Sequence, residues 1–283
     1  MARKGASQTL DLPLPQLSRV CHVSGVGYLT DEAVRDVTGT RIAFLERTGG
    51  VSAEPYDSLN LGLHVDDDPA CVRENRLRTL AALGAGACAG HLLACNQVHG
   101  SDVVVVDGQE QHVRERLADG ADAVVCLQAG IPVLLFFADC LPVILVAPGG
   151  GFAIAHAGWR GALVGIAGKT LEALCAETGC MPDEVNAYIG PHIGACCYEV
   201  SDELLERFVD VFGARCDAGM RHLSLSAAVR EDLLRHGMAS GRIIDPGLCT
   251  RDGQDRFFSH RGSGGRCGRH GAMAVRLDGW RST

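Results

Sequence analysis

The chain has 283 residues, of which 47% are hydrophobic and 21% are charged, and its formal net charge is -8. A chain of this size and composition buries a sizeable core, in one large domain or two small ones. The acidic balance argues against nucleic acid or an anionic membrane as the main partner, although a local basic pocket is still allowed. Small molecules are therefore the expected partners, and the oligomeric state is left open.

The N-terminal segment MARKGASQTLDLPLPQL lacks the continuous apolar stretch of a signal peptide. No run in the chain reaches the roughly 18 apolar residues of a membrane span. We therefore expect a cytoplasmic protein. In that compartment the 13 cysteines are expected to be free thiols, ligands or core residues rather than a disulfide framework.

Residues 1–37 are expected to form an extended lead-in, followed by one domain over residues 38–283. RIAFLERTGG predicts a strand that ends in a Gly-Gly turn, and Asp68 with Pro69 marks the start of a helix. A series of short strands is then expected to form the body of a sheet. Their sequences are LLACNQ, DVVVVD, ADAVVCL, PVLLFFA, PVILVA and FAIAHA.

The pattern becomes helical from Gly158 to Thr178, and Gly179 is the expected stop. VNAYIG predicts a further strand. SDELLERFVDVFG and SLSAAVREDLLRHGM each begin at a serine suited to a helix N-cap and predict two more helices. No repeat or linker divides the chain, so a single domain of strands and helices is the simplest interpretation.

Asp139 and Cys140 interrupt the longest apolar run, PVLLFFADCLPVILVAP. Ionisable groups in such a run cost desolvation unless they are hydrogen-bonded, ligated or catalytic. His156 interrupts a second apolar strand, and His99 lies in NQVHG. Two imidazoles and a thiolate suit zinc with a fourth position left for water or substrate. A buried Cys or His is also common in plain cores, and no CxxC or HExxH signature is present, so residues alone leave both interpretations open.

Seven segments recur in the same order in one known family, over roughly residues 41–276. They are SLNLGLHVDDDPACVRENR, NQVHGSDV, ADAVV, ADCLPVILVAP, HAGWRGALVGI, IGPHIGACCYEV and FFSHR. In these motifs the chain resembles the YfiH-type family, also called the laccase-domain, multicopper polyphenol oxidase or peptidoglycan editing factor family. The resemblance implies an α+β fold, with one domain layered α/β/β/α, and a zinc site made by His99, Cys140 and His156.

The family is similar to enzymes that cleave adenosine, inosine, guanosine and methylthioadenosine with phosphate and that deaminate adenosine. Zinc can lower the pKa of a water molecule for attack at C6 of adenine, which suits deamination. Phosphorolysis needs a cationic clamp for phosphate. Arg160 is the first candidate for that clamp, with a surface arginine at a helix start as the alternative. Copper is an alternative metal, because its intrinsic affinity exceeds that of zinc.

Four further residues are candidates for the site. Asp139 is expected to orient a ligand or bind the substrate, or else to cap local backbone. Asn60, in SLNLG, is a candidate for the substrate rim or for a satisfied turn. Arg47 and Arg76 occupy matching motifs and are weaker candidates for substrate binding.

The tail departs from the family pattern. Gly262 follows Arg261 where relatives often have a second arginine, which puts an anion-binding role there in doubt. His192 either approaches the metal site or packs in the core. For Cys196 and Cys197, packing, metal binding and a redox role are all left open. The Gly-rich segment that follows contains Arg266, Arg269 and His270.

Three other functions remain open. In a thiol hydrolase, Cys140 would be a nucleophile activated by His156. A copper polyphenol oxidase is disfavoured, because a laccase needs His-x-His pairs and the sequence has none. A peptidoglycan-precursor editing role is compatible with the resemblance.

Overall fold

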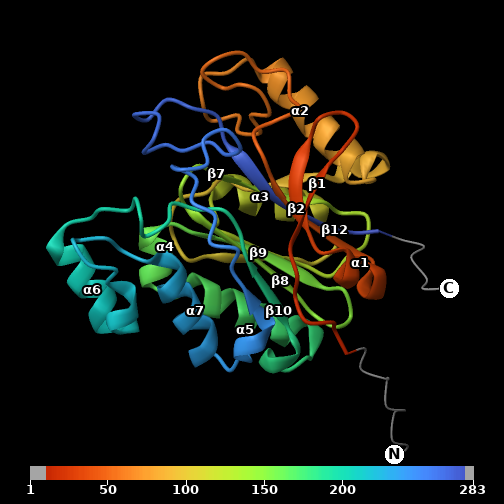
Figure 1. Cartoon of the computed structure of the whole chain (residues 1–283). Helices are drawn as coiled ribbons and strands as arrows, with labels where there is room; N and C mark the ends of the chain where they lie inside the picture. The colour runs from red at the N-terminus through yellow and green to blue at the C-terminus, as the bar shows by residue number, and fades with distance from the viewer. Residues whose placement is uncertain (1–10, 278–283) are drawn as a thin grey trace, which may run out of the picture.

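Two six-stranded sheets lie face to face in the computed structural model, which describes residues 11–277 (Figure 1). The first sheet has the order β1 (Ser18–Cys21), β2 (Gly27–Thr30), β3 (Thr40–Leu45), β12 (His270–Arg276), β7 (Val133–Phe137) and β4 (Leu93–Ala94). The second has the order β11 (Ile243–Ile244), β10 (Asn186–Ile189), β8 (Leu141–Val146), β9 (Phe152–Ala157), β6 (Ala123–Cys126) and β5 (Val103–Val106).

Helices cover the outer faces of both sheets. On the second sheet these are α4 (Trp159–Leu163), α5 (Ile166–Thr178), α6 (Asp202–Phe212) and α7 (Leu225–Arg235). On the first sheet it is α2 (Pro69–Ala82). Short 3₁₀ helices lie at Gly86–His91, Pro182–Glu184, Ala214–Cys216 and Ser240–Arg242. The layers therefore run helix, sheet, sheet, helix, and the expected α+β fold is confirmed.

One core lies between the sheets. It joins side chains such as Phe44 and Phe137 of the first sheet to Phe152 and Tyr188 of the second. Because the inner strands are covered on both faces, their sequences are continuous apolar runs rather than alternating ones. The short strands expected to form one sheet are all present, but they divide between two.

Several predicted helix boundaries are confirmed. Asp68, Ser201 and Ser224 cap α2, α6 and α7 by accepting backbone N–H groups. The helix expected over Gly158–Thr178 is broken, because Gly165 has a left-handed φ of 74° that ends α4 and starts α5. Gly179 closes α5 as expected.

The extended lead-in expected over residues 1–37 is wrong from Ser18 onward. Residues 18–30 form the hairpin of β1 and β2, which pairs with β3 and extends the first sheet. Asp31 then caps α1 (Glu32–Thr38), and Gly39 ends it in a left-handed conformation. Residues 1–10 lie outside the described part of the chain.

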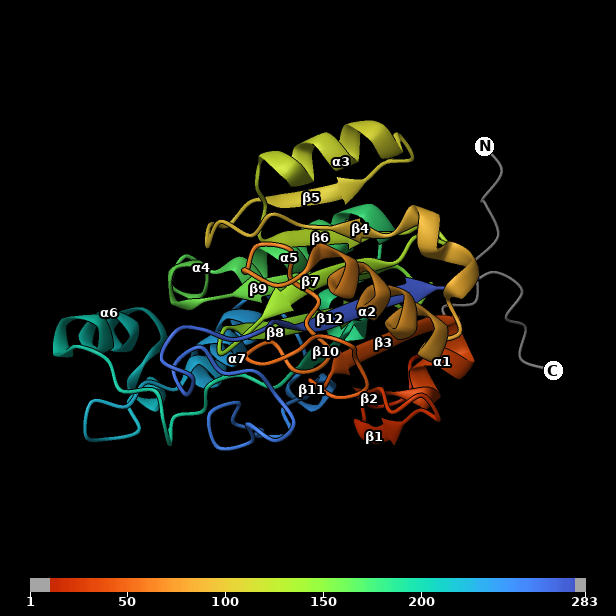
Figure 2. The same cartoon turned by 90° about the horizontal axis from the view of Figure 1, so that it is seen from above.

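Two further elements were not predicted. The helix α3 (Glu110–Asp119) packs beside β5, and Figure 2 shows both at the edge opposite β1 and β2. The strand β12 follows the Gly-rich tail and lies in the middle of the first sheet, between β3 and β7. Residues 270–276 are thus part of the core.

All 13 cysteines fall within residues 11–277, and none of them forms a disulfide there. This agrees with the expectation of free thiols. Within the same residues, no helix combines the length and the apolar character needed to cross a bilayer.

Candidate functional site

Asp139 and Cys140 interrupt the apolar run because the chain changes sheets at this point. β7 belongs to the first sheet and β8 to the second, and the link between them turns at Asp139, whose φ is 89°. The carboxylate of Asp139 stabilises this turn. Oδ1 accepts a hydrogen bond from Thr250 Oγ1 at 2.6 Å, and Oδ2 accepts one from the backbone N–H of Arg261 at 2.6 Å.

The three expected metal ligands meet at this turn. His99 lies in the loop between β4 and β5, Cys140 precedes β8, and His156 lies near the end of β9. Their ligand atoms are all within 4.8 Å of one another, and Cys140 Sγ is 3.8 Å from His99 Nε2. His156 is buried, Cys140 is half-buried and His99 is exposed, so the group is open to solvent on one side.

Asp122, which the sequence analysis did not single out, organises two of the ligands. Its buried carboxylate accepts a hydrogen bond from His156 Nδ1 at 2.7 Å and leaves Nε2 of that ring free to bind a metal. It also accepts the backbone N–H groups of His99 and Gly100, at 3.0 and 2.6 Å. These bonds hold His99 at its left-handed φ of 60°. A carboxylate behind a histidine is the usual support of a metal ligand.

Cys140 and His156 are electrostatically paired. Burial works to raise the pKa of the Cys140 thiol, but the charge on His156 and the hydrogen bonds from His156 and His99 outweigh it and lower the pKa to about 6. Burial works to lower the pKa of His156, but the Cys140 thiolate and the hydrogen bond to Asp122 raise it to about 9. A thiolate is therefore available at neutral pH, and the thiolate is the form that binds metals or attacks carbon.

Gly158 leaves room for these three side chains. A Cβ built at this position would stand 2.9 Å from His99 Cδ2, 3.2 Å from Cys140 Sγ and 3.6 Å from His156 Cε1. Only a glycine lets the backbone approach the ligands this closely. Two imidazole nitrogens and a thiolate, with one side open, fit a zinc ion that keeps a fourth position for substrate.

The ligands line one wall of a cleft of about 490 Å³. The residues that line it include no carboxylate, and Arg269 brings a positive charge. The full lining is His64, Cys95, Asn96, Gln97, His99, Phe136, Ala138, Cys140, His156, His260 and Arg269. The cleft is therefore suited to an anionic ligand beside the candidate metal ligands.

A second hollow of about 430 Å³ adjoins the cleft and shares four lining residues with it, His64, Cys95, Asn96 and Phe136. It adds two further guanidinium groups, those of Arg76 and Arg114. Loss of hydration lowers the pKa of His64, and the charges of Arg269 and Arg76 lower it further. The aromatic faces of Phe136 and His64, whose ring centroids are 5.7 Å apart, thus lie in cationic surroundings.

Arg160 and Asn60 lie away from the lining of this cleft. The Arg160 side chain is exposed, and its guanidinium carbon stacks 4.4 Å from the centroid of the Trp159 ring. Asn60 is fully buried, and its amide bonds to Gly62 and Asp67. Its Oδ1 also accepts the backbone N–H of Arg269 at 2.8 Å, so Asn60 positions a residue that does line the cleft.

The side chain of Arg47 is held in place by contacts within the protein. It donates to the backbone oxygens of Asp57 and Gln254, and its guanidinium lies over the ring of Phe258. Arg76 donates to Leu61 O and stacks over the Phe136 ring, with its guanidinium carbon 5.0 Å from the ring centroid.

His192 packs rather than joining the metal ligands: it is buried, and its Nδ1 bonds to Gly190 O. Arg261 donates its backbone N–H to Asp139, while its guanidinium lies over the Tyr198 ring. Among the tail residues, Arg269 and His260 line the cleft. His260 lies in the family motif FFSHR and Arg269 in the Gly-rich segment after it, but nothing in their spacing pointed to the cleft.

Comparison with known proteins places the chain in a family. The sequence profile described as "Multi-copper polyphenol oxidoreductase laccase" matches residues 41–277. A protein of Streptomyces coelicolor named purine nucleoside phosphorylase is 38% identical over 229 residues, which cover 80% of this chain and 91% of that protein. The purine nucleoside phosphorylase YfiH of Escherichia coli is 36% identical over 219 residues, covering 76% of this chain and 85% of YfiH.

Solved structures agree with this match. YlmD from Geobacillus stearothermophilus superposes with a TM-score of 0.79 at 32% identity, over 89% of this chain and 96% of that one. The chain is thus a laccase-domain protein of α+β fold. It belongs to the YfiH-type family, as its motifs predicted.

Proposed function

We propose that this protein is a zinc-dependent purine nucleoside phosphorylase, which splits adenosine, inosine, guanosine or methylthioadenosine with phosphate into a free base and a ribose 1-phosphate. The observation that carries the proposal is the meeting of His99, Cys140 and His156 in an open cleft that is lined by Arg269 and lacks carboxylates. The names of relatives at 36–38% identity support it.

The residues of the chain divide the work of binding and orientation. His99, Cys140 and His156 would hold the zinc, and Asp122 would fix the tautomer of His156. When bound, zinc acts as a Lewis acid that polarises a substrate atom and lowers the pKa of water. The faces of Phe136 and His64 suit a purine ring, because aromatic groups stack on one another.

Phosphate needs a fixed positive charge close to the ribose. Arg269 is the better candidate than Arg160, because it is half-buried and lines the cleft, while Arg160 lies on Trp159. Hydrogen bonds from Arg269 Nη1 to Cys267 O and Gly268 O hold the guanidinium at 2.8 and 3.0 Å. A guanidinium fixed in this way can bind phosphate without first losing conformational freedom.

Two further activities fit the same cleft. Adenosine deamination would use the zinc and the open position beside His99. A Cys-His thiol hydrolase is favoured by the Cys140 thiolate next to a protonated His156, as the lowered pKa of Cys140 and the raised pKa of His156 imply. Metal dependence separates the last activity from the first two.

Product analysis tests these proposals. Purified protein of known zinc content is incubated with adenosine, with and without phosphate, and products are resolved by chromatography. We expect adenine only when phosphate is present, inosine without phosphate, inosine or hypoxanthine with it, and none of these products from Cys140→Ala. The absence of turnover in zinc-loaded protein would contradict the nucleoside activity. Full activity after removal of zinc would favour the thiol hydrolase.

A further inference from the structure

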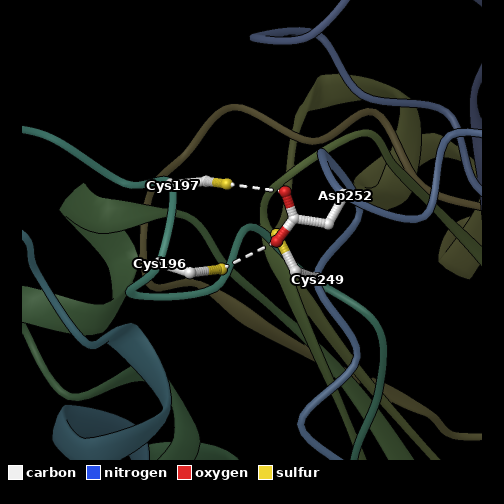
Figure 3. Close-up of side chains that lie close together, drawn as sticks. All are labelled: Cys196, Cys197, Cys249 and Asp252. Carbon is white, nitrogen blue, oxygen red and sulfur yellow. Dashed lines mark hydrogen bonds between the residues drawn. The ribbon is translucent and has the colours of Figure 1, made fainter.

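A second group of metal-ligating side chains lies outside the cleft. Cys196 and Cys197 lie between β10 and α6, and Cys249 and Asp252 lie between β11 and β12. The four ligand atoms are all within 4.8 Å of one another, and Figure 3 shows the side chains pointing toward a common centre. None of the four lines the cleft.

The group is held together by its own contacts. Asp252 accepts one hydrogen bond from each neighbouring thiol, from Cys196 to Oδ2 and from Cys197 to Oδ1, both at 3.1 Å (Figure 3). Cys249 Sγ accepts the backbone N–H of Gly194 at 3.3 Å, which orients it toward the same centre. The carboxylate thus bridges the two neighbouring thiols.

We propose that Cys196, Cys197, Cys249 and Asp252 bind a structural zinc ion. Three sulfurs and one carboxylate oxygen form a closed set of four ligands, as structural zinc sites require. Sulfur donors exclude calcium and magnesium, and the carboxylate favours zinc over monovalent copper. Binding replaces the two thiol protons shared with Asp252 and the proton of Cys249, which pass to solvent, and no oxidation or reduction occurs.

This zinc would hold together two loops, the one between β10 and α6 and the one between β11 and β12. Both loops support the turn at Asp139. The loops are joined by hydrogen bonds from His192 N to Leu248 O and from Thr250 N to His192 O. From them, Thr250 Oγ1 donates to the side chain of Asp139, and Ile193 N donates to its backbone oxygen at 2.9 Å. Asp139 directly precedes Cys140, which would hold zinc in the cleft. The second zinc would therefore help to fix the position of Cys140.

Zinc counting tests the proposal. Protein purified under reducing conditions is analysed by mass spectrometry of its metals, and the wild type is expected to hold two zinc ions per chain. Cys196→Ser/Cys249→Ser should lose one of them, and Cys140→Ala should lose the other. A Cys175→Ser control should keep both, because Cys175 lies near Cys180 and belongs to neither ligand group in the described residues.

The proposal is overturned if Cys196→Ser/Cys249→Ser holds as much zinc per chain as the wild type. Should that variant fail to fold, the wild type supplies a second measurement. Cys196 is exposed, so iodoacetamide should label it after zinc is removed by a chelator and not before. Equal labelling of Cys196 before and after chelation would also overturn the proposal. Because Cys140→Ala reports separately on the cleft, either site can fail without the other.

Discussion

Asp122 is the residue on which the geometry of the candidate metal site in the cleft depends most. It sits at the start of β6, bonds to the ring of His156 and accepts the backbone N–H groups of His99 and Gly100. One buried carboxylate therefore sets the position of two ligands that lie 57 residues apart in sequence (156 minus 99). These bonds, together with one from the backbone N–H of Val98 at 3.3 Å, also offset the cost of burying its charge.

Replacing Asp122 by Asn is expected to weaken zinc binding by roughly 10- to 100-fold, since the support of a ligating histidine is lost. The amide is neutral and no longer favours the tautomer that leaves Nε2 of His156 free. Competition with a chromophoric chelator measures the affinity. The matched control is Asp102→Asn. Asp102 is exposed and directly precedes β5, so this variant should bind zinc as the wild type does. Unchanged affinity in Asp122→Asn would contradict the assigned role.

Gly158 gives a steric test of the same site. Its φ of -65° and ψ of 166° suit alanine, so Gly158→Ala strains no backbone angle, yet the new Cβ would lie 2.9 Å from His99 Cδ2. Because ligand distances must stay within about 0.2 Å, we expect zinc affinity to fall by roughly tenfold or more. Gly149→Ala is the control, since nothing lies within 4 Å of a Cβ there. Equal zinc content in both variants would show that the space is not needed.

At the scale of elements, Glu46 joins the first hairpin to the tail. It lies at the end of β3 with its side chain buried, and it accepts hydrogen bonds from Arg19 of β1 and from Arg256. Burial works to raise the pKa of Glu46, but these two arginines outweigh it and hold the pKa below 4.5. The contact explains why residues before 38 are part of the sheet.

Glu46→Gln is expected to lower the free energy of unfolding by about 2 kcal/mol near neutral pH, since charge-assisted hydrogen bonds are lost. The pKa of the folded state is depressed, so this stabilisation is complete above the ordinary value of 4.5 and is lost as the pH falls through the folded value. Denaturant unfolding at several pH values measures it. The difference from wild type should shrink in acid, while the exposed control Glu206→Gln should match wild type throughout.

The elements that the sequence predicts well are those with strong local signals. The strands buried on both faces are apolar runs, and α2, α6 and α7 begin at capping residues. The hairpin of β1 and β2 and the strand β12 lack such runs, and they are fixed by pairing with distant strands. Gly165 inside an apolar helical pattern gave no sign that the helix breaks there.

The same distinction applies to the site. His99, Cys140 and His156 were predicted because Cys140 and His156 interrupt apolar strands and His99 lies in a family motif, and the structure brings the three side chains close together. No role was predicted for Asp122 or Arg269, because their contacts are with residues far away in the chain. Asn60 was a candidate because it is polar and lies in a family motif. Its side chain is buried, and its amide has hydrogen-bond partners within the protein.

At the scale of the whole molecule, the cleft collects residues from both sheets and from the tail. Arg269→Gln should raise the KM for phosphate by roughly 10- to 100-fold, since a charge-assisted contact to the anion is lost. The KM for the nucleoside should change much less. Initial rates over a phosphate series measure both constants. Arg160→Gln is the control. A large effect of Arg160→Gln on the KM for phosphate, with no effect of Arg269→Gln, would assign the phosphate clamp to Arg160, as the sequence predicted.

The most direct test of the account is a zinc titration of metal-free protein, in which the formation of ribose 1-phosphate from inosine and phosphate is followed. We expect a rate that rises in proportion to the zinc bound and then levels off, and a rate in Cys140→Ala that stays at the baseline at every zinc concentration. A full rate without zinc, or a zinc-dependent rate in Cys140→Ala, would contradict it.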